Sequence, residues 1–448
     1  MGLYTLFAST LLFPLHERLK HHDSVRRRRE LESSQWLDRA ELRALQLRNL
    51  QRFVQRLYRD NDYYRGVMDA SGFSPDDIRS LADLRRFPFL TKPLIRDNVE
   101  ALKTRGCGPL SRFNTGGSTG EPLVFYLGNE RVSHDVAAKW RATRWWDVDI
   151  GDPEIVIWGS PVELGAQDRV RALRDRLLRS KLIPAFEMSA ENLDRFIAEI
   201  RAMRPRMLFG YPSSMALIAE RAESQGIAMD GLGIKVCFVT SERLYDNQRE
   251  LIERVFGAPV ANGYGGRDAG FIAHQCPSGG MHLSAEDILV EIVGPDGEVL
   301  PAGQAGEVVV THLATGEFPF VRYRTGDVAV LDDSQCACGR GLPMLKEIQG
   351  RTTDFIVAPD GTIMHGLALI YILRDLPEVA LFKIIQETAA RYRIQVVPGA
   401  GYGDEHTGTI RAGLRKRLGP DADIVIDLVD DIPRERSGKF RYVVNQFV

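Results

Sequence analysis

The chain has 448 residues, which is long for one domain of ordinary size, so two or more domains are expected. Hydrophobic residues make up 44% and charged residues 26%, a balance that is typical of globular proteins and excludes a disordered chain. The 58 basic and 60 acidic side chains nearly cancel, which argues against a nucleic-acid binder, and five cysteines are too few for a disulfide framework, which favours the cytoplasm.

The first apolar segment, GLYTLFASTLLFPL, is too short to span a bilayer. Two interpretations of it remain open. In one, it is a helix packed on the body of the protein. In the other, residues 1–20 lie in the plane of a membrane, assisted by the basic run SVRRRRE, and the protein is peripheral to that membrane.

The next elements predict a large domain. Residues 30–105 carry apolar side chains at three- and four-residue spacing, so we expect residues 1–105 to form a helical N-terminal segment. A glycine-rich loop follows in FNTGGSTGEPLVF, between two strand-like stretches. From EIVIWGS onward strands and helices alternate, which predicts an α/β part with mainly parallel sheets over residues 106–349, although strands dominate from 283 to 332.

The pattern changes near Gly350. TDFIVAPDGTIMH predicts a hairpin around Pro-Asp-Gly, and a short helix, two strands, a basic helix and a last strand follow. We therefore expect residues 350–448 to form a small α+β domain, which is a normal size for an independent unit.

The glycine-rich loop from Thr115 to Gly120 is not a Walker A motif, because Glu121 and Pro122 follow it where that motif has a lysine and a helix. Taken alone, the loop is either a structural hairpin or a cradle of backbone N–H groups and hydroxyls for phosphates. Later segments also have ordinary explanations when each is taken alone. Asp327 in YRTGDVA can be a turn residue, and Lys439 in IPRERSGKF can be a solvated charge.

Five segments in this order, TGGSTGEP, YGGRDAG, YRTGD, GRTTDFIV and SGKFR, resemble the adenylate-forming superfamily, which includes the acyl-CoA synthetases. The similarity is closest to the phenylacetate–coenzyme A ligase-like branch and its capsule-biosynthesis relatives. It implies ATP-dependent activation of a small carboxylic acid to an acyl-adenylate with release of pyrophosphate, and then transfer to an acceptor, most often the thiol of coenzyme A. One alternative is a ligase that makes an amide or ester in surface-polysaccharide or natural-product biosynthesis. An alternative of another class is a non-catalytic nucleotide-binding scaffold.

The resemblance also implies roles for individual residues. Lys439 would neutralise charge in the transition state, and Asp268 would help to hold Mg²⁺ where the family usually has a glutamate. The small domain would move about a hinge near Thr353, and GYPSS (210–214) would line the acid pocket. The residues that would bind the nucleotide are Thr115, Gly116, Gly117, Ser118, Thr119, Gly120, Ser241, Glu242, Tyr264, Gly265, Asp327 and Arg351.

The cysteines suggest a metal site. Cys276, Cys336 and Cys338 together with His282 come from two loops and fit a tetrahedral, structural zinc site. The Cys-x-Cys spacing is tighter than is usual for zinc, so a pair of reduced thiols is the alternative. Relatives in the branch carry a similar cluster. The expected cofactors are thus ATP, Mg²⁺ and structural zinc, with coenzyme A as a co-substrate.

Overall fold

The computed structural model describes residues 2–114, 123–158, 169–185, 188–351, 355–360, 363–365, 367–433 and 440–447. The chain divides into two compact units. The larger unit contains Met1–Thr325 and Ala329–Ile348, and the smaller unit contains Gly326–Val328 and Gln349–Val448.

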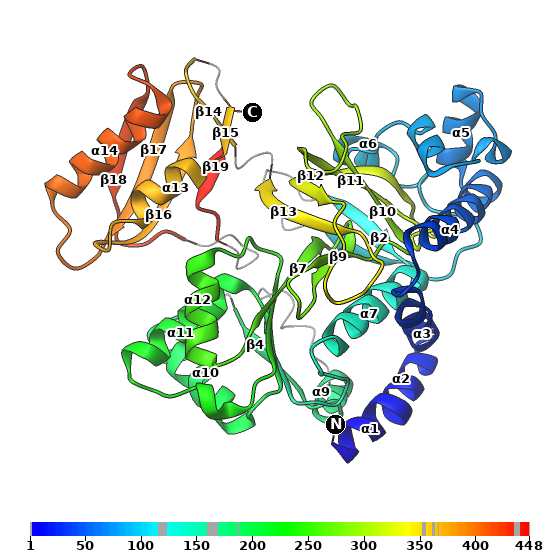
Figure 1. Ribbon diagram of the computed structural model, residues 1–448, viewed down its shortest axis with the longest axis horizontal. Coiled ribbons are helices and arrows are strands. Elements are labelled where there is room, and N and C mark those ends of the chain that lie inside the picture. Colours follow the sequence, from blue (N-terminus) through cyan, green and yellow to red (C-terminus); the bar gives the residue numbers. More distant parts are fainter. Residues whose placement is uncertain are drawn as a thin grey trace. The chain divides into compact units, whose positions relative to one another are not determined.

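Helices form the N-terminal part of the larger unit (Figure 1). Their bounds are α1 Leu3–Phe7, the π-helix η1 Ala8–Leu12, α2 Phe13–Leu19, α3 Ser24–Ser34, α4 Arg39–Asp60, α5 Asp62–Ser71, the short η2 Pro75–Asp77 and η3 Leu81–Arg86, and α6 Lys92–Asp97. The longest of them, α4, begins at a capping box, in which Asp38 accepts from the backbone and Glu41 reaches back to the Asp38 N–H. The predicted helical segment is therefore present.

The larger unit is built on an eleven-stranded sheet in the order β10-β11-β12-β13-β9-β8-β7-β6-β5-β3-β4. The strands are β3 Glu154–Trp158, β4 Ser180–Pro184, β5 Met207–Gly210, β6 Val236–Thr240, β7 Val260–Gly266, β8 Gly270–Gln275, β9 Met281–Leu283, β10 Ile288–Val293, β11 Ala305–His312, β12 Phe320–Asp332 and β13 Met344–Arg351. The pairs from β4 to β7 are parallel, whereas β7–β8, β8–β9, β9–β13 and β10–β11 are antiparallel.

The expected α/β class is confirmed, but the sheet is mixed rather than mainly parallel. The connections explain the difference. Helices join the parallel strands, whereas β8 and β9 are joined by residues 276–280, which are too few for the crossover that a parallel pair requires. A separate antiparallel hairpin, β1 (Ser111–Asn114) with β2 (Val124–Leu127), flanks the glycine-rich loop.

Helices cover both faces of the parallel strands. On one face, α10 (Ala190–Met203), α11 (Pro212–Ser224) and α12 (Asp246–Phe256) bury a core with alternate strand residues such as Leu208 and Cys237. On the other face, α7 (Asn129–Arg144) packs against Phe209 and Phe238, which follow Leu208 and Cys237 in β5 and β6. Burial on both faces explains why these strands are continuously apolar in the sequence.

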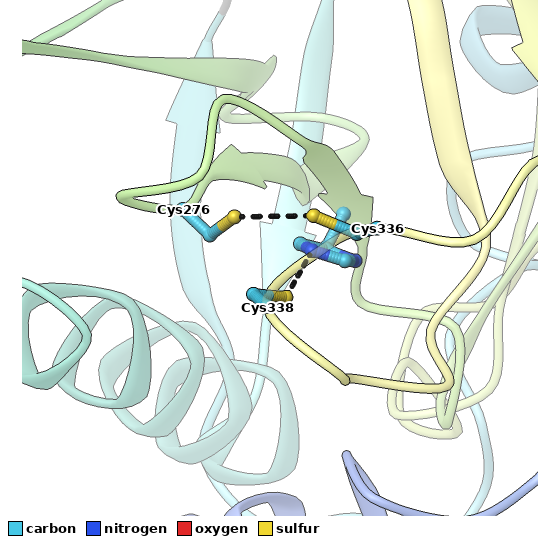
Figure 2. Close-up of side chains that lie close together, drawn as sticks. Cys276, Cys336 and Cys338 are labelled. Atoms are coloured by element: carbon cyan, nitrogen blue, oxygen red, sulfur yellow. Dashed lines mark hydrogen bonds between the residues drawn. The ribbon is translucent and has the colours of Figure 1, made fainter.

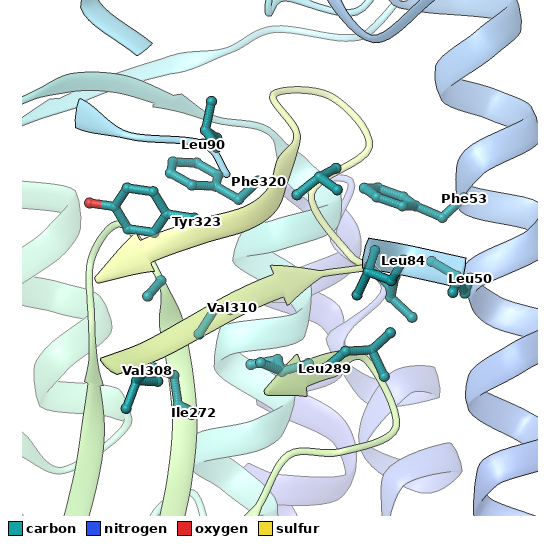
Figure 3. Packing of buried hydrophobic residues seen from close by; sticks show 14 of the residues in the cluster. Leu50, Phe53, Leu84, Leu90, Ile272, Leu289, Val308, Val310, Phe320 and Tyr323 are labelled. Atoms are coloured by element: carbon teal, nitrogen blue, oxygen red, sulfur yellow. The ribbon is translucent and has the colours of Figure 1, made fainter. Parts of the chain in front are cut away.

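The other half of the sheet packs on the N-terminal helices. Leu50 and Phe53 of α4 meet Leu289 of β10, Val310 of β11 and Phe320 of β12 in one buried cluster (Figure 3). This core fixes β12 against the N-terminal segment. It thereby determines where Tyr323, which belongs to the same cluster, stands.

The smaller unit has its own sheet in the order β18-β17-β16-β19. Its elements are the β14 (Phe355–Val357) and β15 (Ile363–His365) hairpin, α13 Leu367–Arg374, β16 Val379–Gln386, β17 Arg391–Pro398, α14 Asp404–Leu418, β18 Asp423–Leu428 and β19 Val443–Asn445. Ile384, Ile394, Ile410 and Leu414 are fully buried, so this unit has its own hydrophobic core. The predicted hairpin and α+β character are both present. Among the described residues of the whole chain, no helix is both long and apolar enough to cross a membrane.

Candidate functional site

Several of the predicted nucleotide-binding residues lie where the parallel strands end. Ser241 and Glu242 follow β6, and Ser241 has a positive φ of 71°, which is uncommon for a residue other than glycine. The Glu242 carboxylate accepts a hydrogen bond of 3.2 Å from the backbone N–H of Ser213 in the first turn of α11. TSE and GYPSS therefore meet at the carboxyl edge of the sheet, where open α/β folds bind ligands.

GYPSS contains the end of β5 and the start of a helix. Helix α11 begins at Pro212, so Ser213 and Ser214 belong to its first turn. Proline is favoured at this position because its missing N–H has no partner in the helix. The ring of Tyr211 just before it stacks on Trp158 at the end of β3, with the ring centroids 4.5 Å apart. An aromatic pair thus lies at the start of α11, the helix whose first turn donates to the Glu242 carboxylate.

The turn between β7 and β8 carries the next predicted residues. The β7–β8 pairing shifts register between Tyr264 and Gly265. A Cβ on Gly265 would lie 2.0 Å from the Gly270 carbonyl oxygen, so only glycine fits there. Tyr264 is 8% exposed and belongs to the main buried cluster.

Asp268 is held on both of its carboxylate oxygens. Its Oδ2 accepts a 2.7 Å hydrogen bond from the hydroxyl of Tyr323 on β12, and its Oδ1 accepts one of 3.0 Å from the N–H of Ala269. Asp268 is nevertheless partly exposed. A carboxylate that is fixed in orientation and open to solvent on one side is suited to a hydrated Mg²⁺, which takes one or two such ligands.

Arg131 of α7 fixes the backbone beneath this carboxylate. Its guanidinium is buried, and its Nε–H donates to both carboxylate oxygens of Asp135, at 2.9 and 3.0 Å. Its Nη1 and Nη2 donate to the carbonyl oxygens of Asp268 and Arg267, both at 3.2 Å. The guanidinium is planar and its donors have fixed directions, so these bonds together restrict the backbone at Arg267 and Asp268. Sequence reasoning did not assign Arg131 or Tyr323. Tyr323 opens the YRTGD segment, whereas nothing in the sequence pointed to Arg131.

Three fully buried histidines lie near Arg131. His134 and His312 pack ring to ring with centroids 4.7 Å apart, and burial lowers the pKa of His274 to about 3 and that of His312 well below its usual value. His134, Asp135 and His312 are close enough together to hold a metal. The N–H of Ala314 donates to Nδ1 of His312, however, which leaves the proton on Nε2, and the cationic Arg131 is adjacent. The Arg131 guanidinium already pairs with Asp135, so this group is poorly suited to a second cation.

Cys276, His282, Cys336 and Cys338 converge, as the sequence predicted (Figure 2). Their ligand atoms all lie within 4.8 Å of one another. The sulfur atoms of Cys276 and Cys336 are 3.6 Å apart, and Nε2 of His282 is 3.2 Å from the sulfur of Cys338. A Cβ on Gly280 would lie 2.6 Å from the Cys336 sulfur, so a glycine gives this cluster its room.

The protonation chemistry of this cluster fits a metal. Nδ1 of His282 lies 3.2 Å from the Leu342 carbonyl oxygen, a partner that places the proton there and leaves Nε2 facing the sulfurs. Burial lowers the pKa of His282 to about 4, so its imidazole is neutral. Burial raises the pKa of Cys276 to about 12, which a bound cation would reverse. Three thiols and one neutral imidazole form a donor set for a tetrahedral ion.

The remaining predicted residues are less fully described. Asp327 lies in β12 and is partly buried, and Arg351 is the last residue of β13, where only its backbone is described. The loop Thr115–Gly120, the hinge position Thr353 and Lys439 lie outside the described residues. Their roles stay predictions.

Comparison with known proteins confirms the expected resemblance. Residues 356–446 match the family model of the CapK C-terminal domain. The chain is 28% identical over 358 residues to a phenylacetate–coenzyme A ligase of Thermus thermophilus, with 77% of each chain covered. It is 23% identical over 424 residues to Protein CapK of Staphylococcus aureus, which covers 90% of this chain and 88% of that protein.

Solved structures agree on the fold. A crystal structure of 2-hydroxyisobutyryl-CoA ligase in the postadenylation state, in complex with R3-HIB-AMP, matches with a TM-score of 0.74 and 22% identity. The match covers 92% of this chain and 91% of that ligase. The chain thus has the fold of the acyl-CoA ligases of the adenylate-forming superfamily over nearly its whole length, in both units.

Proposed function

We propose that this chain, with its adenylate-forming fold, is an AMP-forming acid–CoA ligase. It activates a small carboxylic acid with ATP to an acyl-adenylate, releases pyrophosphate and transfers the acyl group to the thiol of coenzyme A. The observation that carries the proposal is the similarity to curated phenylacetate–coenzyme A ligases along 77% of the chain, together with an acyl-CoA ligase fold over 92% of it. The match is not confined to one domain, so both parts that an adenylating enzyme needs are represented.

The residues suit the first half-reaction. A carboxylate and a triphosphate are both anions, so positive charge must be supplied at the reacting phosphorus. We assign Asp268 to hold Mg²⁺, because Tyr323 and Ala269 fix its orientation while it stays partly exposed. Mg²⁺ would neutralise phosphate charge when bound. We assign Lys439 of the small domain to the charge that develops in the transition state.

The nucleotide-binding roles follow the same proposal. Asp327 would accept hydrogen bonds from the ribose hydroxyls, because a carboxylate has the two oxygens that this needs. Ser241, Glu242, Tyr264 and Gly265 would line the adenine pocket at the carboxyl edge of the sheet. Thr115–Gly120 would cradle the β- and γ-phosphates, and Arg351 would contact the ribose or phosphates.

The domains take corresponding roles. Residues 106–349 bind the nucleotide and the acid, residues 1–105 support them, and residues 350–448 are the mobile part that carries Lys439 in and out. We place the enzyme in the cytoplasm, where ATP and coenzyme A are available. The cluster of Cys276, His282, Cys336 and Cys338 holds a structural zinc ion, because four protein ligands leave no open position for chemistry.

A second acceptor is favoured by one specific observation. Protein CapK aligns with 90% of this chain, more than the 77% that aligns with the Thermus ligase, and residues 356–446 match a CapK domain model. The second half-reaction would then join the adenylate to an amine or hydroxyl and give an amide or ester. The first half-reaction is the same for both acceptors.

The experiment is a pyrophosphate-release assay with a panel of aromatic and short aliphatic acids, ATP and Mg²⁺. We expect at least one acid to give release that depends on the acid, and coenzyme A to raise its rate with a thioester as the product. If pyrophosphate forms but coenzyme A has no effect while an amine or hydroxyl compound does, the acceptor assignment is wrong and the CapK-like alternative is correct. If no acid supports release, the proposal of a ligase fails.

A further inference from the structure

The first helical segment of the chain comprises α1, η1 and α2 (Figure 1). Large apolar side chains are exposed along it. Nine of the twelve large apolar side chains that are exposed in the described residues lie on this segment or on α9 (Arg169–Leu177). They are Leu3, Tyr4, Leu6, Phe7, Leu11, Leu15 and Leu19 on the first segment and Leu173 and Leu177 on α9. Single exposed leucines are ordinary, but a concentration of this kind marks an interaction surface.

The opposite side of the segment is anchored to the body of the protein. The Thr5 hydroxyl donates a buried 2.7 Å hydrogen bond to Asp152, and Phe13 packs edge-on against Trp140 with centroids 5.1 Å apart. Ala8 packs directly on Gly151, because a Cβ added to Gly151 would lie only 2.4 Å from the Cβ of Ala8. The segment is therefore a docked helix, as the first interpretation of the sequence expected, and its apolar face is held outward.

The π-helical turn keeps that face on one side. In an α-helix, residues four apart drift steadily around the axis, because a turn holds about 3.6 residues. A π turn, closed by i→i+5 hydrogen bonds, holds more residues per turn, so residues four apart shift around the axis in the opposite direction. With η1 in the middle, Leu3, Phe7, Leu11, Leu15 and Leu19 are all exposed at successive four-residue steps.

Helix α9 extends the surface. The Tyr4 hydroxyl donates a 2.6 Å hydrogen bond to the Leu177 carbonyl oxygen, and the guanidinium of Arg179 lies 5.5 Å from the Tyr4 ring centroid. Leu173 and Leu177 thereby join the apolar face. We call these nine side chains the apolar face of α1–α2 and α9.

Basic side chains border this face, and the one acid of α9 with a described side chain, Asp175, pairs with Arg174. Arg18 and Lys20 at the end of α2, and Arg176 and Arg179 beside α9, are all exposed. The one acid among residues 2–22 is Glu17, which is buried and accepts from Ser24. An exposed apolar face with a basic rim complements a lipid surface that carries negative headgroups.

Three of the four arginines of the basic run SVRRRRE are paired with carboxylates, whereas Arg29 is exposed. Arg26 pairs with Asp23 and Glu30, Arg27 with Asp23 and Glu130, and Arg28 with Glu32. All of these pairs lie within α3 and its N-terminal cap, except that of Arg27 with Glu130 of α7. The basic side chains that border the apolar face are those of α2 and α9.

We propose that the apolar face of α1–α2 and α9 docks in the plane of an anionic lipid bilayer. The leucines and Phe7 enter the boundary between headgroups and acyl chains, and the basic rim contacts anionic headgroups. The proposal does not depend on which reaction the protein catalyses. It places this chain on a membrane surface.

The test is co-sedimentation of the full chain with vesicles of phosphatidylcholine alone or mixed with phosphatidylglycerol. We expect binding to the mixed vesicles, much weaker binding to phosphatidylcholine alone, and a decline with added salt. Leu11→Ser with Leu15→Ser should weaken binding about tenfold or more, because two large apolar side chains no longer enter the bilayer. Lys20→Glu with Arg176→Glu should weaken it to a similar degree, about fivefold for each charge removed.

Controls come from exposed residues elsewhere. Leu428→Ser on β18 and Lys416→Glu on α14 make the same changes outside the face and should leave binding unchanged. Because all substituted side chains are exposed, the melting temperature should stay near that of the wild type. No binding to anionic vesicles by the wild type, or equal binding by face and control variants, overturns the proposal. Light scattering that shows a dimer, lost in the face variants, would assign the face to a second copy of this chain instead.

Discussion

The hydroxyl of Tyr323 donates a 2.7 Å hydrogen bond to Oδ2 of Asp268, although the two residues are 55 positions apart in the chain. Tyr323 stands on β12, and its ring lies in the main hydrophobic cluster, so the hydroxyl has little freedom to move. Arg131 holds the backbone of Asp268 from the other side. The proposed magnesium ligand is thus oriented by residues that never touch the metal.

Tyr323→Phe removes one hydrogen bond and keeps the ring. We expect an apparent Mg²⁺ affinity about tenfold weaker in acid-dependent pyrophosphate release, because the carboxylate loses its orientation, and a stability loss of only about 1 kcal/mol. The measurement is a Mg²⁺ titration of the initial rate. Tyr64→Phe is the matched control, since the buried Tyr64 hydroxyl donates to the Pro319 carbonyl oxygen and accepts from the Val321 N–H but does not bond Asp268, so its loss should affect stability alone. An unchanged Mg²⁺ dependence in Tyr323→Phe would show that Asp268 needs no such orientation.

The cysteine cluster should contain one zinc ion per chain. Cys338→Ser should abolish the bound zinc measured by mass spectrometry and lower the melting temperature, because one thiolate of the tetrahedral set is missing. Cys107→Ser, a free cysteine outside the cluster, should keep the metal. Purified wild-type protein without zinc, and with a melting temperature that a strong chelator does not change, would favour the alternative of reduced thiols.

Stability should fall between pH 7 and pH 5. His312 is fully buried and its pKa in the folded protein is well below 6.5, so below pH 6.5 the unfolded chain binds a proton that the folded chain does not. The free energy of unfolding therefore decreases as pH falls, by about 2 kcal/mol at pH 5 for this one histidine. Urea unfolding at the two pH values measures the change.

Substitution of His312 should flatten that pH dependence. His312→Gln should be less stable than the wild type at pH 7 but should lose about 2 kcal/mol less between pH 7 and pH 5. His21→Asn is the control, because His21 is exposed and its left-handed backbone accepts asparagine. Equal pH slopes in wild type and His312→Gln would mean that His312 takes up its proton in the folded state.

Lys439→Ala should abolish adenylate formation and leave the fold intact. The reason is electrostatic, since negative charge builds up on the oxygens around the five-coordinate α-phosphorus in the transition state. Pyrophosphate release is the measurement, and Lys416→Ala, an exposed lysine of α14 in the same unit, is the control. Equal turnover in Lys439→Ala and wild type would refute the role assigned to Lys439.

The sequence predicted those parts of the fold in which local pattern and burial agree. The alternation of strands and helices from EIVIWGS onward predicted the α/β part, and Pro-Asp-Gly predicted the β14–β15 hairpin, because each signal is short-range. The parallel character was overestimated beyond β7. Strand direction there depends on connection length and on pairing with distant strands, which periodicity does not report.

The candidate site was predictable where its chemistry is rare. Cys276, Cys336 and Cys338 are three of only five cysteines, so their grouping was visible in the chain, and they do converge. Arg131 was not predictable, because arginine is common on helices and its role depends on the fold placing α7 beneath the β7–β8 turn. Long-range packing, rather than residue type, selects such residues.

The central claim is that the acid's carboxylate attacks the α-phosphorus of ATP. An acid labelled with ¹⁸O in its carboxyl group tests this directly when the products are analysed by mass spectrometry after turnover with coenzyme A or another acceptor. We predict that one ¹⁸O appears in AMP and that pyrophosphate is unlabelled, because the carboxylate oxygen stays on the α-phosphorus when the adenylate breaks down. Label in inorganic phosphate with formation of ADP, or AMP without label, would contradict the account.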